Sequence, residues 1–216
     1  MKEKLSDDYK WEEYTNQYSK QILEEIKPVR ELLLKDFSVA DNDIKFYDNL
    51  CANWKELYYQ VVRTGVSSVL ECGCGSGQHL QNLYTINNKL DLCGCELLQS
   101  QIDFGRTKLG ISESVLKNIT VLDMSVVGAH KHFKKKFDFV YTQAVLMHLS
   151  TKKVVTFVEN MVQLSNRYIL VLENPRDHEY ESIIHDVCKR MGVQCSVQKT
   201  SKHSNHGTLV SLTKEN

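Results

Sequence analysis

The sequence has 216 residues with 27 basic and 27 acidic side chains, so its formal net charge is zero. This length suits one α/β domain with a short appendage, and a neutral chain has no overall attraction for nucleic acid or anionic membranes. No apolar run approaches bilayer length and residues 1–8 contain no apolar signal core, so we expect a cytoplasmic protein without a membrane partner. The seven cysteines fit a reducing compartment better than a disulfide framework.

The N-terminal part of the chain is predicted to be a helical extension, residues 1–52, that precedes a main domain of residues 53–216. Apolar residues recur in it at helical intervals, and Pro28 interrupts the pattern. The extension is either a lid over the active site or a packed appendage. Tyr14 and Tyr18 are candidates for a substrate pocket, although packing of a helix face is the commoner explanation for such aromatic residues.

Strands and helices alternate through the main domain. Residues 53–64 are predicted to form an amphipathic helix that ends at Gly65. The predicted strands are 66–71, 90–96, 119–122, 137–142, 168–172, 193–199 and 208–213. Helical segments separate the early strands, which indicates a parallel sheet, whereas the last two strands follow each other directly and leave the last one antiparallel. The pattern predicts an α/β, Rossmann-like domain with a mostly parallel seven-stranded sheet.

A glycine-rich loop follows the first predicted strand. Glycine occupies every second position at Gly73, Gly75 and Gly77, so the chain can turn sharply and expose its backbone to a ligand. A dinucleotide-binding loop would have its third glycine one position later, where this sequence has Gln78. The spacing therefore favours an adenosine cofactor without a pyrophosphate.

Acidic residues stand at the ends of the first three predicted strands. Glu71, Glu96 and Asp123 would lie along one rim, because ligands of a parallel sheet bind beyond the carboxyl ends of its strands. Thr142 and Gln143 follow the fourth strand and reach the same rim. Three carboxylates would repel a pyrophosphate but suit a ligand with a sulfonium and an ammonium group. S-adenosylmethionine is such a ligand.

These segments, in this order, resemble the class I S-adenosylmethionine-dependent methyltransferases over roughly residues 53–213. The resemblance implies that Glu96 holds the ribose hydroxyls and that Asp123 with Met124 contacts the adenine. Residues 137–149 are similar to the family's fourth-strand motif, in which many small-molecule members carry a histidine like His148. The candidate cofactor-binding residues are Glu71, Gly73, Cys74, Gly75, Gly77, Glu96, Leu97, Asp123, Met124, Thr142 and Gln143.

His148 is the candidate catalytic residue. If the acceptor is a hydroxyl, a base must take its proton, and a histidine with a pKa near neutrality suits that task. A structural histidine that fixes the loop is the alternative. Two later loops supply the remaining candidates for substrate binding or are solvated surface: Asn174, Arg176, His178, His203 and His206.

Four cysteines form two Cys-x-Cys pairs, Cys72 with Cys74 and Cys93 with Cys95. Each pair ends an apolar strand, where cysteine serves as a small buried residue, and zinc ribbons usually place their ligands as Cys-x-x-Cys on turns. We therefore expect no metal. Nothing near Cys74 in the sequence would stabilise a thiolate, so packing is favoured over reactivity.

The predicted function is methyl transfer to an oxygen of a small polar or anionic metabolite. The sequences of residues 137–149 and 165–175 look closest to methylases of bacterial sugar and cell-surface glycan pathways. An Asn/Asp-Pro-Pro-Tyr/Phe motif, typical of enzymes that methylate base amino groups, is absent after the fourth strand, so no nucleic-acid partner is expected. The alternatives are a methyltransferase of a macromolecule, either a protein side chain or an RNA ribose, and a non-catalytic module that keeps the fold as a scaffold.

Overall fold

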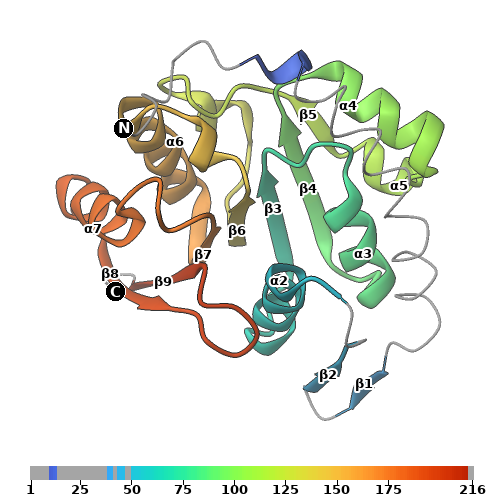
Figure 1. Ribbon diagram of the computed structural model, residues 1–216, viewed down its shortest axis with the longest axis horizontal. Coiled ribbons are helices and arrows are strands. Elements are labelled where there is room, and N and C mark those ends of the chain that lie inside the picture. The colour runs from blue at the N-terminus through green and yellow to red at the C-terminus, as the bar shows by residue number, and fades with distance from the viewer. Residues whose placement is uncertain (1–9, 14–37, 41–42, 47–49, 214–216) are drawn as a thin grey trace.

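The computed structural model describes residues 10–13, 38–40, 43–46 and 50–213 (Figure 1). Most of them form three layers, in which helices cover both faces of a seven-stranded sheet. Its strands are β3 (Ser68–Cys72), β4 (Asp91–Glu96), β5 (Ile119–Val121), β6 (Phe137–Gln143), β7 (Ser165–Leu172), β8 (Gln194–Lys199) and β9 (Gly207–Thr213). The predicted α/β fold and its seven-stranded sheet are confirmed.

The strand order of this sheet is β5-β4-β3-β6-β7-β9-β8. The strands from β3 to β7 run parallel, whereas β9 pairs antiparallel with both β7 and β8. The last strand is therefore antiparallel, as predicted, and it lies one position in from the sheet edge. From β3 the chain proceeds outward to β5 and then returns to the other side of β3 as β6. The strand order thus reverses between β3 and β6, which is where open α/β sheets bind their ligands.

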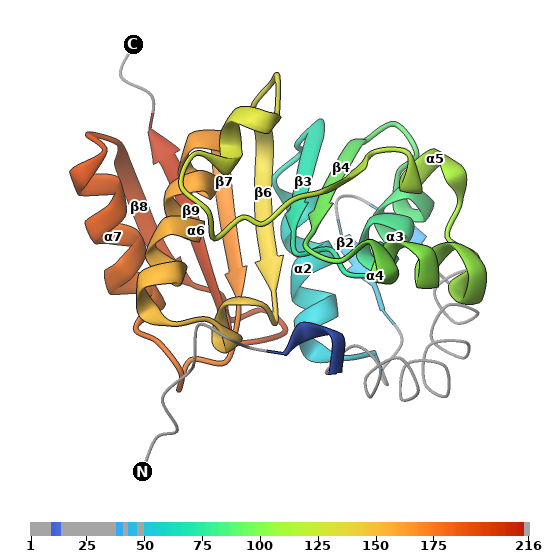
Figure 2. The ribbon, with the colours of Figure 1, turned by 90° about the horizontal axis from the view of Figure 1, so that it is seen from above.

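The helices belong to two groups that lie beside different parts of the sheet (Figures 1 and 2). The α-helices are α2 (Ala52–Arg63), α3 (Gln78–Ile86), α4 (Gln99–Phe104), α5 (Glu113–Leu116), α6 (Thr151–Leu164) and α7 (Tyr180–Arg190). Helix α4 continues as the π-helical turn η1 (Gly105–Leu109), and the 3₁₀ turns η2 (Ala129–His132) and η3 (Leu146–His148) flank β6. Within the described ranges, no helix is long and apolar enough to cross a membrane.

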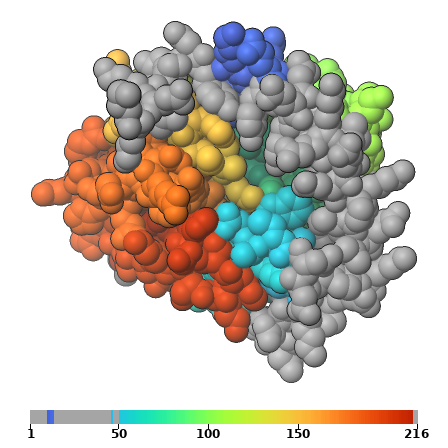
Figure 3. Space-filling view, viewed as in Figure 1, coloured from blue at the N-terminus to red at the C-terminus, as the bar shows by residue number. Residues whose placement is uncertain are grey.

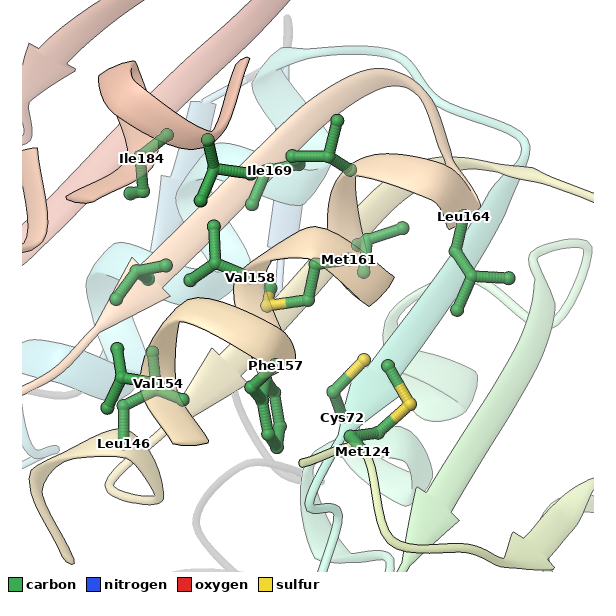
Figure 4. Close-up of a cluster of buried hydrophobic side chains, with 14 of the residues drawn as sticks. Cys72, Met124, Leu146, Val154, Phe157, Val158, Met161, Leu164, Ile169 and Ile184 are labelled. Carbon is green, nitrogen blue, oxygen red and sulfur yellow. The ribbon is translucent and has the colours of Figure 1, made fainter. Parts of the chain in front are cut away.

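Alternate residues of the central strands pack on opposite faces of the sheet, because strand side chains alternate with a period of two. Val69 and Phe139 join the buried cluster with α2 and α3, and Leu70 joins the cluster with α6 and α7. Figure 4 shows the second cluster, in which Met124 and Phe157 lie near Cys72. Both faces of the central strands are buried, which explains why a run such as residues 169–172 in β7 is apolar without interruption.

Part of the predicted N-terminal extension lies within the described residues. Residues 11–13 are helical, and β1 (Ser38–Ala40) pairs with β2 (Asp43–Lys45) in a short antiparallel hairpin. The division of the chain at residue 52 stays a prediction. Tyr14 and Tyr18 lie outside the described residues.

Candidate functional site

A pocket of about 370 Å³ lies at the switch point, beyond the carboxyl ends of β3 and β6. Its lining comes from the glycine loop after β3, from the ends of β4 and β5, and from the turn after β6. Helices α2, α3 and α6 contribute further side chains. The volume lies at the lower end of the range usual for small-ligand pockets, about 300–1,000 Å³.

The glycine loop after β3 forms one wall of the pocket. Gly73 has a φ of +77°, and its N–H and that of Cys74 both donate to the carbonyl of Cys95, at 2.8 and 3.0 Å. A Cβ at Gly73 would stand 2.5 Å from a methyl group of Val145 in the turn after β6. Only glycine therefore permits the close approach of these two loops and the left-handed turn. The other two glycines of the predicted motif also have positive φ.

Glu96, at the end of β4, fixes the glycine loop from the side of the pocket. Its carboxylate accepts hydrogen bonds from the backbone N–H of Gly75 at 2.8 Å and of Leu98 at 3.0 Å. The side chain is almost fully buried, and burial raises its pKa. Glu96 and the neighbouring Leu97 both line the pocket.

Glu71, at the end of β3, is an acid that is shielded from solvent and has few hydrogen-bond partners. It is 2% exposed and lines the pocket, and its Oε2 has no hydrogen-bond partner among the described residues. Burial raises the pKa of Glu71 well above its usual value, and the nearby Glu96 adds to the rise. A cation in the pocket would therefore favour the ionised form of Glu71.

Asp123 and Met124 border the pocket just after β5. Oδ1 of Asp123 accepts from both the backbone N–H and the hydroxyl of Ser125, each at 2.7 Å, and Oδ2 makes no bond within the described residues. Met124 is buried in the α6 cluster, where its side chain lies near Phe157 (Figure 4). A flat ring bound here would contact both a carboxylate oxygen of Asp123 and the apolar side chain of Met124.

Thr142 and Gln143, the predicted pair at the end of β6, have different surroundings in the structure. Gln143 lines the pocket, whereas Thr142 is fully buried and does not belong to the lining. Ala144 has a φ of +55°, and the chain then turns so that Ala144 and Val145 line the pocket. The carboxylate of Glu173 holds this turn by accepting from the backbone N–H of Val145 at 2.9 Å and from one further N–H.

The structure places His148 in turn η3, next to the pocket and not among its lining residues. Its ring meets the ring of Trp11 edge-on, with centroids 5.4 Å apart, and Trp11 does line the pocket. Burial lowers the pKa of His148, while the charge of Asp177 acts in the opposite direction. The catalytic role of His148 stays a prediction.

The other predicted substrate residues that the structure describes are not among the residues that line the pocket. Asn174 Oδ1 accepts from the N–H of Arg176 at 3.1 Å, and the ring of His178 donates from Nε2 to the carbonyl of Leu149 at 3.0 Å. The backbone N–H of His203 donates to Glu56 on α2, which joins the β8–β9 loop to that helix (Figure 3). His206 belongs to the same loop, and its carbonyl accepts from the N–H of Glu173 at 3.3 Å. In both loops, several polar groups of these residues are therefore used in hydrogen bonds within the chain.

Several pocket residues were missed from the sequence. They come from helices whose pocket-facing side had no motif to mark it, and they include Trp54, Gln78, His79, Lys153 and Phe157. The amphipathic pattern at residues 53–64 correctly predicted helix α2, but it could not show that Trp54 reaches the ligand side. The sequence signal that could have marked the pocket residues of α3 is the position of this helix directly after the glycine loop.

Residues 69–167 match the family model described as "Methyltransferase domain". The match covers just under half of the chain and identifies a methyltransferase domain within it. No curated protein has a significantly similar sequence. S-adenosylmethionine is the cofactor of this methyltransferase domain, as the sequence predicts.

Solved structures with the same fold share little sequence with this methyltransferase. The methyltransferase domain of bacterial CtHen1 has 15% identity and a TM-score of 0.56, and the match covers 75% of this chain and 100% of that one. Magnesium protoporphyrin IX methyltransferase from Synechocystis PCC 6803, with bound S-adenosylmethionine, has 15% identity and a TM-score of 0.54, with 92% and 95% covered. CalS10, an amino pentose methyltransferase from Micromonospora echinaspora, has 13% identity and a TM-score of 0.55, with 74% and 92% covered. At these identities the likeness shows the fold.

The residues of the pocket fit the methyl donor. Glu71 is a buried acid with an unpartnered oxygen, which matches a cationic ligand, and the glycine loop leaves room for a ligand against the backbone. Gln78 Nε2 and Gln143 Oε1 are also buried without a hydrogen-bond partner among the described residues. Buried polar groups normally have partners, so a ligand with both donors and acceptors is implied.

Proposed function

We propose that this methyltransferase transfers the methyl group to an oxygen of a small polar or anionic metabolite, such as a sugar, a phosphorylated intermediate or a glycan precursor. The observation that carries the proposal is the pocket at the switch point, where the glycine loop meets three carboxylates, Glu71, Glu96 and Asp123. CalS10, an amino pentose methyltransferase of the same fold, supports a small sugar-like acceptor. A cytoplasmic location and a small-molecule partner belong to this proposal.

Methyl transfer asks mainly for alignment and for exclusion of water. The sulfonium of the donor makes its methyl group electrophilic, so the acceptor oxygen forms the new C–O bond while the C–S bond breaks. The proton of the acceptor hydroxyl must go to a base, and we propose His148 for this role. Its lowered pKa keeps the imidazole unprotonated at physiological pH, so that the ring can accept a proton. Trp11 and Trp54 line the pocket with aromatic rings, which would leave less room for water beside the ligand.

The loops after β7 and between β8 and β9 are proposed to contact the acceptor. Asn174, Arg176, His178, His203 and His206 supply donors for hydroxyl, phosphate or carboxylate oxygens. Because the described loops lie outside the pocket lining, this role requires an acceptor that extends beyond the pocket. Recognition of a larger acceptor, such as a protein side chain or an RNA ribose, is the competing proposal.

Cofactor binding separates the enzyme from a scaffold of the same fold. We expect calorimetry to show binding of S-adenosylmethionine and S-adenosylhomocysteine and no binding of NAD. Formation of S-adenosylhomocysteine is then measured with phosphorylated metabolites, nucleotide sugars, short oligonucleotides and a peptide mixture as acceptors. Binding without turnover on any of them supports the non-catalytic module, and turnover only on peptides or oligonucleotides contradicts the small-molecule acceptor.

The role of His148 is tested by a pair of substitutions with opposite expected effects. His148→Ala should lower turnover about 100-fold, the usual contribution of a general base, with cofactor affinity within about twofold. Asp123→Ala should weaken cofactor binding about tenfold and lower saturated turnover little. Steady-state kinetics and calorimetry on both variants give the two readouts. Unchanged turnover in His148→Ala would show that another group accepts the proton.

A further inference from the structure

His79 lines the pocket from the first turn of α3, two residues after the glycine loop. Its ring packs edge-on against Trp54, with centroids 4.9 Å apart, and Trp54 lines the pocket as well. The ring is therefore held in place on its apolar side. None of the sequence motifs singled out this histidine.

A hydrogen-bonded chain behind the ring determines which nitrogen carries the proton. Nδ1 of His79 lies 2.8 Å from the hydroxyl oxygen of Tyr58, and the side-chain amide of Asn82 donates to that oxygen at 2.8 Å. Tyr58 is fully buried and Asn82 nearly so. Because the amide already donates to the Tyr58 oxygen, the hydroxyl hydrogen is directed to Nδ1 of His79. The neutral ring then carries its own hydrogen on Nε2.

The state of the ring follows from its surroundings. Burial lowers the pKa of His79 to about 4, so the imidazole is neutral at physiological pH. Its Nε2 makes no hydrogen bond within the described residues, although the ring borders the pocket. With Nδ1 occupied and Nε2 protonated, His79 offers the pocket a donor and no lone pair, and it is therefore unsuited to act as a base.

The charges around the pocket indicate which group of the ligand accepts the hydrogen bond from His79. Glu71, Glu96 and Asp123 are acceptors, suited to the ammonium, sulfonium and hydroxyl groups of the donor molecule. The single anionic group of S-adenosylmethionine is the carboxylate of its methionine part. His79 and Gln78 place side-chain donors on the first turn of α3, where the helix dipole also favours a negative charge.

We propose that His79, held by Tyr58 and Asn82 in the Nε2–H form, donates a hydrogen bond to the carboxylate of the cofactor's methionine part. This inference rests on the proposed function, since it presumes S-adenosylmethionine as the ligand. It makes His79 a cofactor-binding residue whose orientation depends on two residues behind it. Lys153, on α6, is the cation of the described pocket lining and is the competing candidate for the carboxylate.

The test compares S-adenosylmethionine with its decarboxylated form, which keeps the sulfonium and the ammonium but lacks the carboxylate. Calorimetry measures the affinity of both ligands for the wild type, His79→Ala, His79→Gln and Tyr58→Phe. Lys153→Met serves as the matched control for the competing candidate. Thermal unfolding of each variant reports whether the fold is kept, and His79→Gln and Tyr58→Phe keep the test available if His79→Ala unfolds.

We expect His79→Ala to weaken binding of S-adenosylmethionine between about 10-fold and about 100-fold, as for a hydrogen bond to a charged group. Binding of the decarboxylated ligand should change less than about twofold. His79→Gln, which keeps an N–H donor, should recover most of the affinity. Long-range ¹H–¹⁵N spectra should show His79 of the wild type protonated at Nε2, and Tyr58→Phe should populate both neutral forms.

The outcomes distinguish this inference from the proposed function. A folded wild-type protein that binds neither ligand contradicts the proposed function. If the wild type binds both ligands, the inference is overturned when His79→Ala weakens them equally or weakens neither. It is also overturned if Lys153→Met alone shows the carboxylate-specific loss, or if the wild-type ring carries its proton on Nδ1.

Discussion

Two buried carboxylates, on either side of the switch point, hold pocket loops in the same way. Glu96 accepts from the N–H groups of Gly75 and Leu98, at 2.8 and 3.0 Å. Glu173 accepts from the N–H groups of Val145 and Met147, at 2.9 and 3.2 Å. Each acid therefore replaces the hydrogen bonds that a sharply turning backbone cannot make to itself.

The two acids differ in what else they can reach. Glu96 lines the pocket, whereas Glu173 is 1% exposed and lies behind the turn that it supports. Burial raises the pKa of both, and that of Glu173 rises to about 7. The same pair of hydrogen bonds thus gives a ligand-binding acid on one side and a supporting acid on the other. The difference depends on the access of a ligand to the carboxylate.

The largest effect expected from this comparison is on the pH dependence of stability. The pKa of Glu173 is about 7 in the folded protein and near 4.3 in an unfolded chain, so between these pH values the folded state holds the extra proton. The free energy of unfolding therefore falls as the pH rises through this window, by about 3 kcal/mol for this group. Glu173→Gln should remove this contribution to the pH dependence of the free energy of unfolding.

Urea unfolding at pH 5 and pH 8 measures the effect. The loss of stability between the two pH values should be about 3 kcal/mol smaller in Glu173→Gln than in the wild type. Other raised carboxyls, Glu71 and Glu96, contribute equally to both proteins and cancel in the difference. An identical loss in both proteins would show that Glu173 titrates near its ordinary pKa.

A smaller effect, on ligand affinity, separates the two acids directly. An amide has one acceptor oxygen where the carboxylate has two, so Glu→Gln removes one backbone hydrogen bond at either position. Glu96→Gln should weaken binding of S-adenosylhomocysteine about 30-fold, because Glu96 also faces the ligand. Glu173→Gln should change it less than about threefold. Calorimetry at one pH gives both values, and equal losses would mean that loop geometry alone sets the affinity.

The sequence predicted those parts of the molecule that depend on residues close together in the chain. The glycines at every second position correctly indicated a sharp turn after β3, and the alternation of elements correctly indicated a parallel sheet with an antiparallel last strand. Acids at strand ends could be placed on one rim, because parallel strands end at the same edge of the sheet. Glu71, Glu96 and Asp123 all line the pocket for that reason.

The sequence could not show the surroundings of a side chain whose partners lie far away along the chain. Thr142 and Gln143 are neighbours, but the alternation of strand side chains buries the first and turns the second to the pocket. Glu173 directly follows β7, yet its carboxylate accepts a hydrogen bond from a turn 28 residues earlier in the chain. His79 carried no motif at all.

The sequence by itself determined the fold, the cofactor class and the acids of the rim, because these follow from residue spacing along single strands and loops. The tertiary structure decided which polar groups remain available to a ligand. Hydrogen bonds between distant residues, such as those joining His79, Tyr58 and Asn82, fix the proton position and orientation of a side chain. That information arises only when α2 and α3 pack together on the same face of the sheet.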